Sequence, residues 1–128
     1  MQVKTFDDKK NGLVLICEGG RDLPFEIKRF YLITNLSLEA VRGRHAHKTL
    51  EQYIFCAKGS FDLELDDGEK KQTIRMSDSG EGIRLGPMLW HTMRNFSDDC
   101  TIIVAAGEHY DESDYIRDYD AFKALIKK

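Results

Sequence analysis

Ser60-Phe61-Asp62-Leu63-Glu64-Leu65-Asp66-Asp67-Gly68 is the stretch that decides the fold class. Polar and apolar residues alternate strictly from Ser60 to Leu65, so the apolar side chains share one face of an extended strand. Asp67-Gly68 follows, a dipeptide that tight hairpin turns prefer because it tolerates positive φ. Residues 71–76 are the expected returning strand. The stretch therefore predicts an antiparallel hairpin with one face in the core.

Short runs rich in β-forming residues lie on both sides of this hairpin. The expected strands are 13–17, 25–36, 52–57, 83–85, 90–94 and 101–106. From Ser113 onward the apolar residues recur at helical spacing, and Ser113 is the predicted N-cap. Many short strands followed by one amphipathic helix favour an all-β fold, a barrel or jelly roll with a helical tail. We interpret residues 1–128 as a single domain, with a β-barrel over 1–110 and a C-terminal helix over 111–128.

Composition and charge limit the possible partners. The 128 residues are 41% hydrophobic and 32% charged, and the net charge of −3 gives no whole-chain attraction to nucleic acid. No stretch approaches the ~20 apolar residues that a membrane span needs. The three cysteines, Cys17, Cys56 and Cys100, are far apart and fit free thiols better than a disulfide framework. We expect a cytoplasmic protein with neither nucleic acid nor membrane as a partner.

The residues suited to chemistry gather in Arg42-Gly43-Arg44-His45-Ala46-His47-Lys48. Residues two apart in a strand point the same way, so His45 and His47 should share one face, with Ala46 opposite. Glu51 has the same parity and joins them if the strand continues. A third histidine, His91, follows a turn at Gly86-Pro87.

This spacing leaves three interpretations open. The histidines are half-buried structural residues in the first. In the second, His45, His47, Glu51 and His91 form a metal site, because His-x-His, a glutamate four residues on and a distant histidine supply N/O ligands for Fe, Mn, Ni or Zn. In the third they perform acid–base catalysis without metal, since imidazole titrates near about pH 6.5.

The arginine–histidine stretch resembles the RGxHAHK segment of the sugar 3,4-ketoisomerases, the WxcM-like family of cupins. The similarity continues in residues 22–31, in 86–91 and in the more specific sequence YDESDYIRDYD at 110–120. Members of this family are metal-free and move the carbonyl of dTDP-4-keto-6-deoxy-D-glucose from C4 to C3. They form dimers that exchange N-terminal strands. The resemblance implies a cupin jelly roll, that substrate, no cofactor, and a homodimer with exchanged strands.

The resemblance also implies roles for particular residues. His45 is the base at the sugar, His47 is its neighbour, and Tyr31 is a hydroxyl that reaches the same carbons. His91 helps to return the proton. The diphosphate needs cations, and the substrate-binding candidates are Arg29, Arg42, Arg44, Lys48, Gln52, Arg84 and Trp90.

The product and the rival functions complete these expectations. In the resembling family, histidine at the position of His91 accompanies a product of galacto configuration, and arginine a gluco product. Asn11 stands where relatives carry tyrosine or arginine, and Arg84 where they often carry an aromatic residue. The alternatives are a keto-sugar 3,5-epimerase, a metal-dependent cupin enzyme and a non-catalytic sugar-binding cupin.

Overall fold

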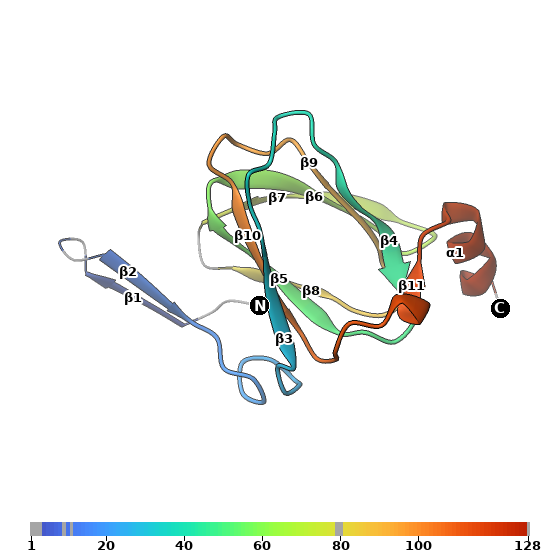
Figure 1. The fold of residues 1–128 in the computed structure, drawn as a ribbon, viewed down its shortest axis with the longest axis horizontal. Helices are drawn as coiled ribbons and strands as arrows, with labels where there is room; N and C mark the ends of the chain where they lie inside the picture. Colours follow the sequence, from blue (N-terminus) through green and yellow to red (C-terminus); the bar gives the residue numbers. More distant parts are fainter. Residues whose placement is uncertain (1–3, 9, 11, 79–80, 128) are drawn as a thin grey trace.

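The computed structural model describes residues 4–8, 10, 12–78 and 81–127, so Asn11 lies outside the described residues (Figure 1). Two helical elements lie near the C-terminus, a 3-10 turn at Glu112–Asp114 before the last strand and the helix α1 at Tyr119–Ile126 after it. The strands are β1 (Lys4–Asp8), β2 (Gly12–Ile16), β3 (Arg29–Ile33), β4 (Arg42–His47), β5 (Gln52–Lys58), β6 (Ser60–Asp66), β7 (Lys71–Ser77), β8 (Gly82–Leu85), β9 (Trp90–Arg94), β10 (Thr101–Ala106) and β11 (Tyr115–Ile116). The prediction of an all-β fold with one terminal helix is confirmed.

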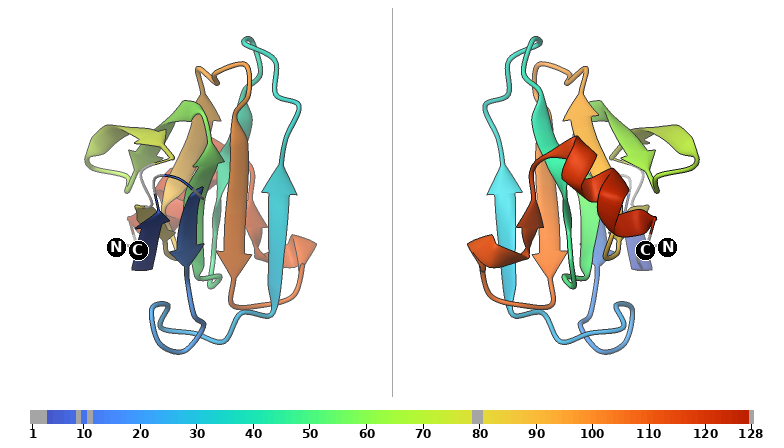
Figure 2. Two further views of the ribbon diagram at one scale, coloured as in Figure 1. Left: turned by 90° about the vertical axis from the view of Figure 1, so that its left-hand side faces the viewer. Right: turned by 90° about the vertical axis from the view of Figure 1, so that its right-hand side faces the viewer.

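The body of the protein consists of two facing antiparallel sheets (Figures 1 and 2). One has the strand order β3-β10-β5-β8 and the other β11-β4-β9-β6-β7. The core lies between them, with Ile54 and Ile102 from the first sheet and Phe61 and Leu63 from the second, all fully buried. Among the described strands no pairing joins the two sheets, so the jelly roll is a two-layer sandwich and not a closed barrel.

The hairpin predicted from alternation is present. Phe61 pairs with Met76 and Leu63 with Ile74 across β6 and β7. Gly68 adopts φ +99° in the turn, and its N–H donates to Asp66 Oδ1 at 2.8 Å. The positive φ of the turn therefore explains the glycine.

One predicted strand is shorter than expected. The apolar run over 25–36 yields only β3, Arg29–Ile33. Phe25 and Ile27 precede it in a loop, where they pack against Leu23 and Ala105. These residues are apolar because they cover a small secondary core and not because they belong to a strand.

The C-terminal helix begins later than predicted. Its N-cap is Asp118, which accepts a hydrogen bond from the Asp120 N–H at 3.1 Å, so the predicted cap at Ser113 and the helix over 111–128 were wrong. Ser113 lies in the 3-10 turn, and β11 then pairs with β4, placing Tyr115 opposite His47. Residues with helical local spacing therefore form a strand here, because they pair with the distant strand β4. No helix in the described part of the chain has the length and apolar character to span a membrane.

The N-terminal strands stand apart from this body. Among the described strands, β1 and β2 pair with each other and with no third strand, and Figure 1 shows this hairpin projecting to one side of the sandwich. A two-stranded hairpin is marginally stable by itself.

Candidate active site

Three histidines meet between the two sheets. The ring centroids of His45 lie 5.0 Å from His47 and 4.6 Å from His91. One ring nitrogen from each lies within 4.8 Å of the others. Ala46 points to the opposite side, where it is buried with Phe122 of α1. The structure thus keeps His45 and His47 on one face, as the sequence predicted, and adds His91 from the neighbouring strand.

A β-bulge in β4 sets the direction of these side chains. The register between β4 and β9 shifts between Gly43 and His45, and the extra residue, Arg44, has φ +60°. Residues an odd number apart in a regular strand point to opposite faces, whereas the bulge turns both Arg42 and His45 into one pocket. Gly43 has φ +83°, and a Cβ there would lie 2.8 Å from the His91 carbonyl oxygen. Glycine is therefore required where β4 and β9 approach.

The backbone fixes the proton positions on two of the rings. His45 Nδ1 lies 3.1 Å from the Gly43 carbonyl oxygen, and His91 Nδ1 lies 3.2 Å from that of Leu89. A carbonyl oxygen can only accept, so in each neutral ring Nδ1 carries the hydrogen and Nε2 keeps its lone pair. Both rings present Nε2 as the proton acceptor.

Burial keeps all three imidazoles neutral. It lowers the pKa of His45, lowers that of His47 to about 4, and lowers that of His91 to about 3. Neighbouring histidines add to this effect at His47 and His91, because two positive rings at this distance repel. At neutral pH the cluster is therefore available as a base.

Two hydrogen-bond donors come from the opposite sheet. The Tyr31 hydroxyl of β3 donates to Gln52 Oε1 at 2.8 Å, and burial raises the pKa of Tyr31 to about 12. Gln52 is 1% exposed, and its Nε2 has no hydrogen-bond partner among the described residues. Tyr31 stays protonated at neutral pH, and its O–H can donate to a bound oxygen in place of Gln52 Oε1.

The pocket between the sheets has a volume of about 290 Å³ and arginines on its wall. Arg29, Arg42 and Arg117 line it together with Tyr31, His45 and His91. Sequence reasoning missed Arg117, although it lies inside the resembling YDESDYIRDYD segment. Its guanidinium stacks over Tyr115, 4.3 Å from the ring centroid, and pairs with Glu112 at 2.9 Å. The pocket combines a neutral base, a hydroxyl group and cations.

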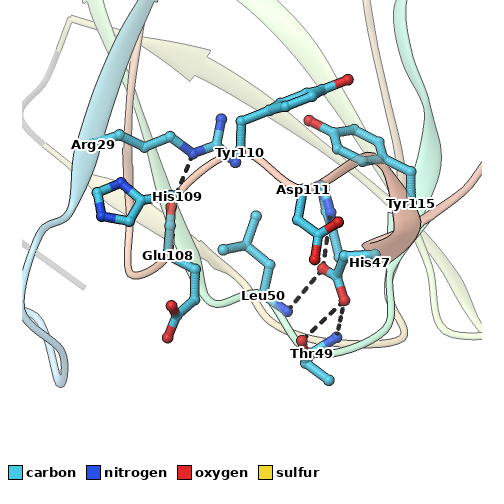
Figure 3. Close-up of a pocket in the computed structure, with 10 residues that line it drawn as sticks. Arg29, His47, Thr49, Leu50, Glu108, His109, Tyr110, Asp111 and Tyr115 are labelled. Atoms are coloured by element: carbon cyan, nitrogen blue, oxygen red, sulfur yellow. Dashed lines mark hydrogen bonds and ion pairs between the residues drawn. The ribbon is translucent and has the colours of Figure 1, made fainter.

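A second pocket adjoins the first (Figure 3). It has a volume of about 410 Å³ and shares Arg29, Tyr110 and Tyr115 with its neighbour, so these three residues separate the two. His47 lines this second pocket, beside the acidic residues Glu108, Asp111 and Asp114. The negative side chains make this pocket the poorer of the two for a phosphate.

Four predicted binding residues lie away from the histidines. Arg44 and Lys48 are exposed and line none of the described pockets. Arg84 makes a two-pronged ion pair with Glu51. Trp90 packs edge-on against Tyr119 of α1, with ring centroids 5.2 Å apart. These contacts account for Arg84 and Trp90 without a ligand.

Glu51, the carboxylate ligand expected in the metal interpretation, does not lie with the histidines. β4 ends at His47, so the parity that would have placed Glu51 beside the histidines stops there, and Glu51 pairs with Arg84 instead. Among the described residues, the candidate metal ligands that lie together are three imidazole nitrogens, within 4.8 Å of one another.

Comparisons with known proteins bear directly on this site. The family model described as FdtA, WxcM-like, C-terminal, matches residues 1–127. The chain belongs to this family. It is 46% identical over 125 residues to the TDP-4-oxo-6-deoxy-alpha-D-glucose-3,4-oxoisomerase of Aneurinibacillus thermoaerophilus, covering 98% of this chain and 89% of the relative.

Solved structures of family members have the same fold. QdtA, a sugar 3,4-ketoisomerase from Thermoanaerobacterium thermosaccharolyticum crystallised with TDP, is 38% identical, with a TM-score of 0.95 over 98% of this chain and 91% of that one. A histidine-to-asparagine variant of QdtA bound to TDP-4-keto-6-deoxyglucose is 37% identical, with a TM-score of 0.94 and the same coverage. The likeness extends over the sheets that build the histidine cluster.

Proposed function

We propose that this chain is a 3,4-ketoisomerase that moves the keto group of dTDP-4-keto-6-deoxy-D-glucose from C4 to C3 through an enediolate. The observation that carries the proposal is the pair of neutral histidines, His45 and His91, that lines one pocket together with Tyr31, with His47 beside His45. It is supported by the 46% identical oxoisomerase and by the QdtA complex with this keto sugar. A binding module needs no buried neutral base.

The reaction requires a proton removed from C3, a hydroxyl hydrogen passed from O3 to O4, a proton delivered to C4, and one stabilised anion. His45 Nε2 removes the proton at C3, next to the C4 ketone, and the negative charge passes to the oxygens of the enediolate. Tyr31 lines this pocket from the opposite sheet, and its O–H donates toward this charge by turning away from Gln52 Oε1. His47 or His91 assists in delivering a proton to C4, which leaves the carbonyl at C3. Atoms balance without a cofactor, because the substrate and product are isomers.

The cations of the pocket account for the nucleotide. Arg29, Arg42 and Arg117 lie on the wall of the pocket that holds His45, whereas the adjoining pocket is acidic. Arginine binds phosphate oxygens with two parallel N–H groups. The diphosphate is held by these three residues, with the hexose at the histidines.

The product has galacto configuration at C4. A planar enediolate receives its proton on one of two faces, and the face decides between gluco and galacto. His91 is directly opposite His45 in the β4–β9 pairing, and in the resembling family histidine at this position accompanies the galacto outcome. The 3-keto-6-deoxy sugar formed in this way is a precursor of an amino-deoxysugar.

The functional unit is a homodimer that exchanges N-terminal strands. The outer face of β3 presents Phe30 and Leu32, which are 66% and 57% exposed. An apolar groove of about 360 Å³ continues from Phe30 to Leu15 and Phe55, and exposed apolar surface of this kind marks an interface. A second copy would cover it and stabilise the separate β1–β2 hairpin. Sedimentation should show a dimer for the wild type and a monomer for Phe30→Glu.

The enzyme acts in the cytoplasm, where its three free cysteines persist.

Incubation of the keto sugar with the enzyme in deuterated water tests the reaction. A ketoisomerase gives a 3-keto product with deuterium at C4. A 3,5-epimerase exchanges C5 and leaves the carbonyl at C4, and a binding protein exchanges nothing. Either of these last two results would overturn the proposal.

A further inference from the structure

His47 differs from the other two histidines in what its Nδ1 faces. At His45 and His91 this atom lies beside a backbone carbonyl oxygen. At His47 the facing group is the carboxylate of Asp114, with Nδ1 and Oδ2 3.4 Å apart. His47 is 2% exposed, and neither ring nitrogen has a hydrogen-bond partner among the residues that the structure describes. Asp114 therefore takes the place that a carbonyl oxygen has at the other rings.

The carboxylate of Asp114 is held firmly by the loop after β4. Oδ1 accepts from the Thr49 N–H and the Thr49 hydroxyl, both at 2.9 Å, and Oδ2 accepts from the Leu50 N–H at 3.2 Å (Figure 3). The Asp114 carbonyl oxygen also accepts from the Lys48 N–H at 2.9 Å. These bonds leave a lone pair on Oδ2 for the histidine, because a carboxylate oxygen accepts more than one hydrogen bond.

The next residue in the chain fixes the ring from its other side. Tyr115 pairs with His47 across β11 and β4, and the two ring centroids lie 4.4 Å apart. Asp114 and Tyr115 thus hold His47 from one short segment, the segment in which a helix was expected.

We propose that Asp114 is a positioning residue for the isomerase: it accepts the Nδ1–H of His47 and so leaves Nε2 as the proton-accepting atom. This inference rests on the proposed function, in which His47 assists the proton transfer. A carboxylate cannot donate, so the opposite tautomer would set two acceptors against each other. The separation of 3.4 Å shortens when substrate binds, since acid–base contacts are commonly long in empty sites. All three histidines then carry their ring hydrogen on Nδ1 and keep Nε2 as the accepting atom.

Asp114→Asn is the direct test. Asparagine keeps an oxygen for Thr49 but places an N–H₂ group against His47 Nδ1, which moves the ring hydrogen to Nε2 and also removes the hydrogen bond from the Leu50 N–H. With ¹⁵N-labelled histidine, the ring nitrogen shifts of His47 should show hydrogen on Nδ1 in the wild type and on Nε2 in the variant. We expect kcat to fall about 10- to 100-fold with KM nearly unchanged, the loss seen when carboxylates behind metal-bound histidines are removed.

Thr49→Val is the matched control. It deletes the hydroxyl bond to the same carboxylate and leaves the pair of Asp114 and His47 in place. Its melting temperature should fall. The ring hydrogen of His47 should stay on Nδ1, and kcat should stay within about twofold of the wild-type value. An unchanged tautomer in Asp114→Asn, or an equal loss of kcat in Thr49→Val, would overturn the proposal. The NMR measurement needs no turnover, so a failed keto-sugar assay would refute the proposed function without deciding this point.

Discussion

His45 and His91 lie directly opposite each other across β4 and β9, with their ring centroids 4.6 Å apart. Each Nδ1 faces the carbonyl oxygen of the residue two positions earlier in the chain. The two strands thus orient both rings by backbone contacts alone, so that no other side chain is needed to set their tautomers.

Replacing His45 with asparagine should lower turnover by about 10²–10⁴-fold, the contribution of a positioned acid–base group. Asparagine keeps a polar side chain but takes up no proton at neutral pH, so TDP affinity should remain near that of the wild type. Initial rates with the keto sugar and calorimetry with TDP measure the two effects. His109→Asn is the control, because His109 is exposed and lines only the adjoining pocket. Near-normal turnover in His45→Asn would remove this residue from the mechanism.

The sequence predicted the strands better than it predicted the site. Alternation in 60–65 and the apolar runs at 90–94 and 101–106 are local signals, and the strands formed where they lie. The bulge at Arg44 is not a local signal, because it exists only in the register between β4 and β9. That register decides that Arg42 enters the pocket and that Arg44 does not.

The C-terminal segment shows the same limit. Tyr115 and Ile116 fit a helical period with Tyr119 and Phe122, and only the edge of β4 makes them a strand. Because this pairing precedes α1, Arg117 reaches the pocket and stacks on Tyr115. A rule based on local spacing therefore missed a cation and placed the helix cap five residues early.

Arg42 and Arg44 make a matched pair for testing the diphosphate contact. Arg42→Ala should weaken TDP binding about 10- to 100-fold, since a hydrogen bond to a charged group contributes about 1.5–3 kcal/mol and 1.4 kcal/mol is tenfold. Arg44→Ala should change the Kd by less than about twofold, because its side chain lines none of the described pockets. Both variants lose one positive charge, so the long-range electrostatic effect on the Kd is the same in both and does not contribute to the difference between them. Equal effects in calorimetry would contradict the assignment.

Chelation separates the acid–base mechanism from a metal-dependent one. We expect turnover to survive prolonged dialysis against EDTA, because neutral imidazoles and a tyrosine hydroxyl suffice for the proton transfers. The three histidine nitrogens are close enough together to be candidate metal ligands, but Glu51, the expected carboxylate ligand, pairs with Arg84. Loss of activity on chelation, with rescue by Fe, Mn, Ni or Zn, would show that a metal is required.

Stability should fall as the pH drops below that of an ordinary histidine. In the folded protein the pKa of His91 is lowered to about 3, against 6.5 for an unperturbed ring. Between these values the unfolded chain binds a proton that the folded chain does not, so the free energy of unfolding decreases as the pH falls. In His91→Gln the slope between pH 6 and pH 4 should be smaller by about 1.4 kcal/mol per pH unit. Urea unfolding over this pH range measures the slope. Parallel plots of the free energy of unfolding against pH for the two proteins would contradict the lowered pKa of His91.

His91 also offers a test of the face on which C4 is protonated. We expect the wild type to give the galacto product and His91→Arg to give gluco product, because the arginine cannot deliver a proton at neutral pH and leaves the other face to another donor. His91→Gln is the control for loss of the ring: its turnover should be slow, without a new product. The product can be trapped by transamination at C3 and the C4 configuration read from its proton couplings by NMR. A gluco product from the wild type would refute the galacto assignment. An unchanged product from His91→Arg, with a normal circular dichroism spectrum, would show that another group selects the face.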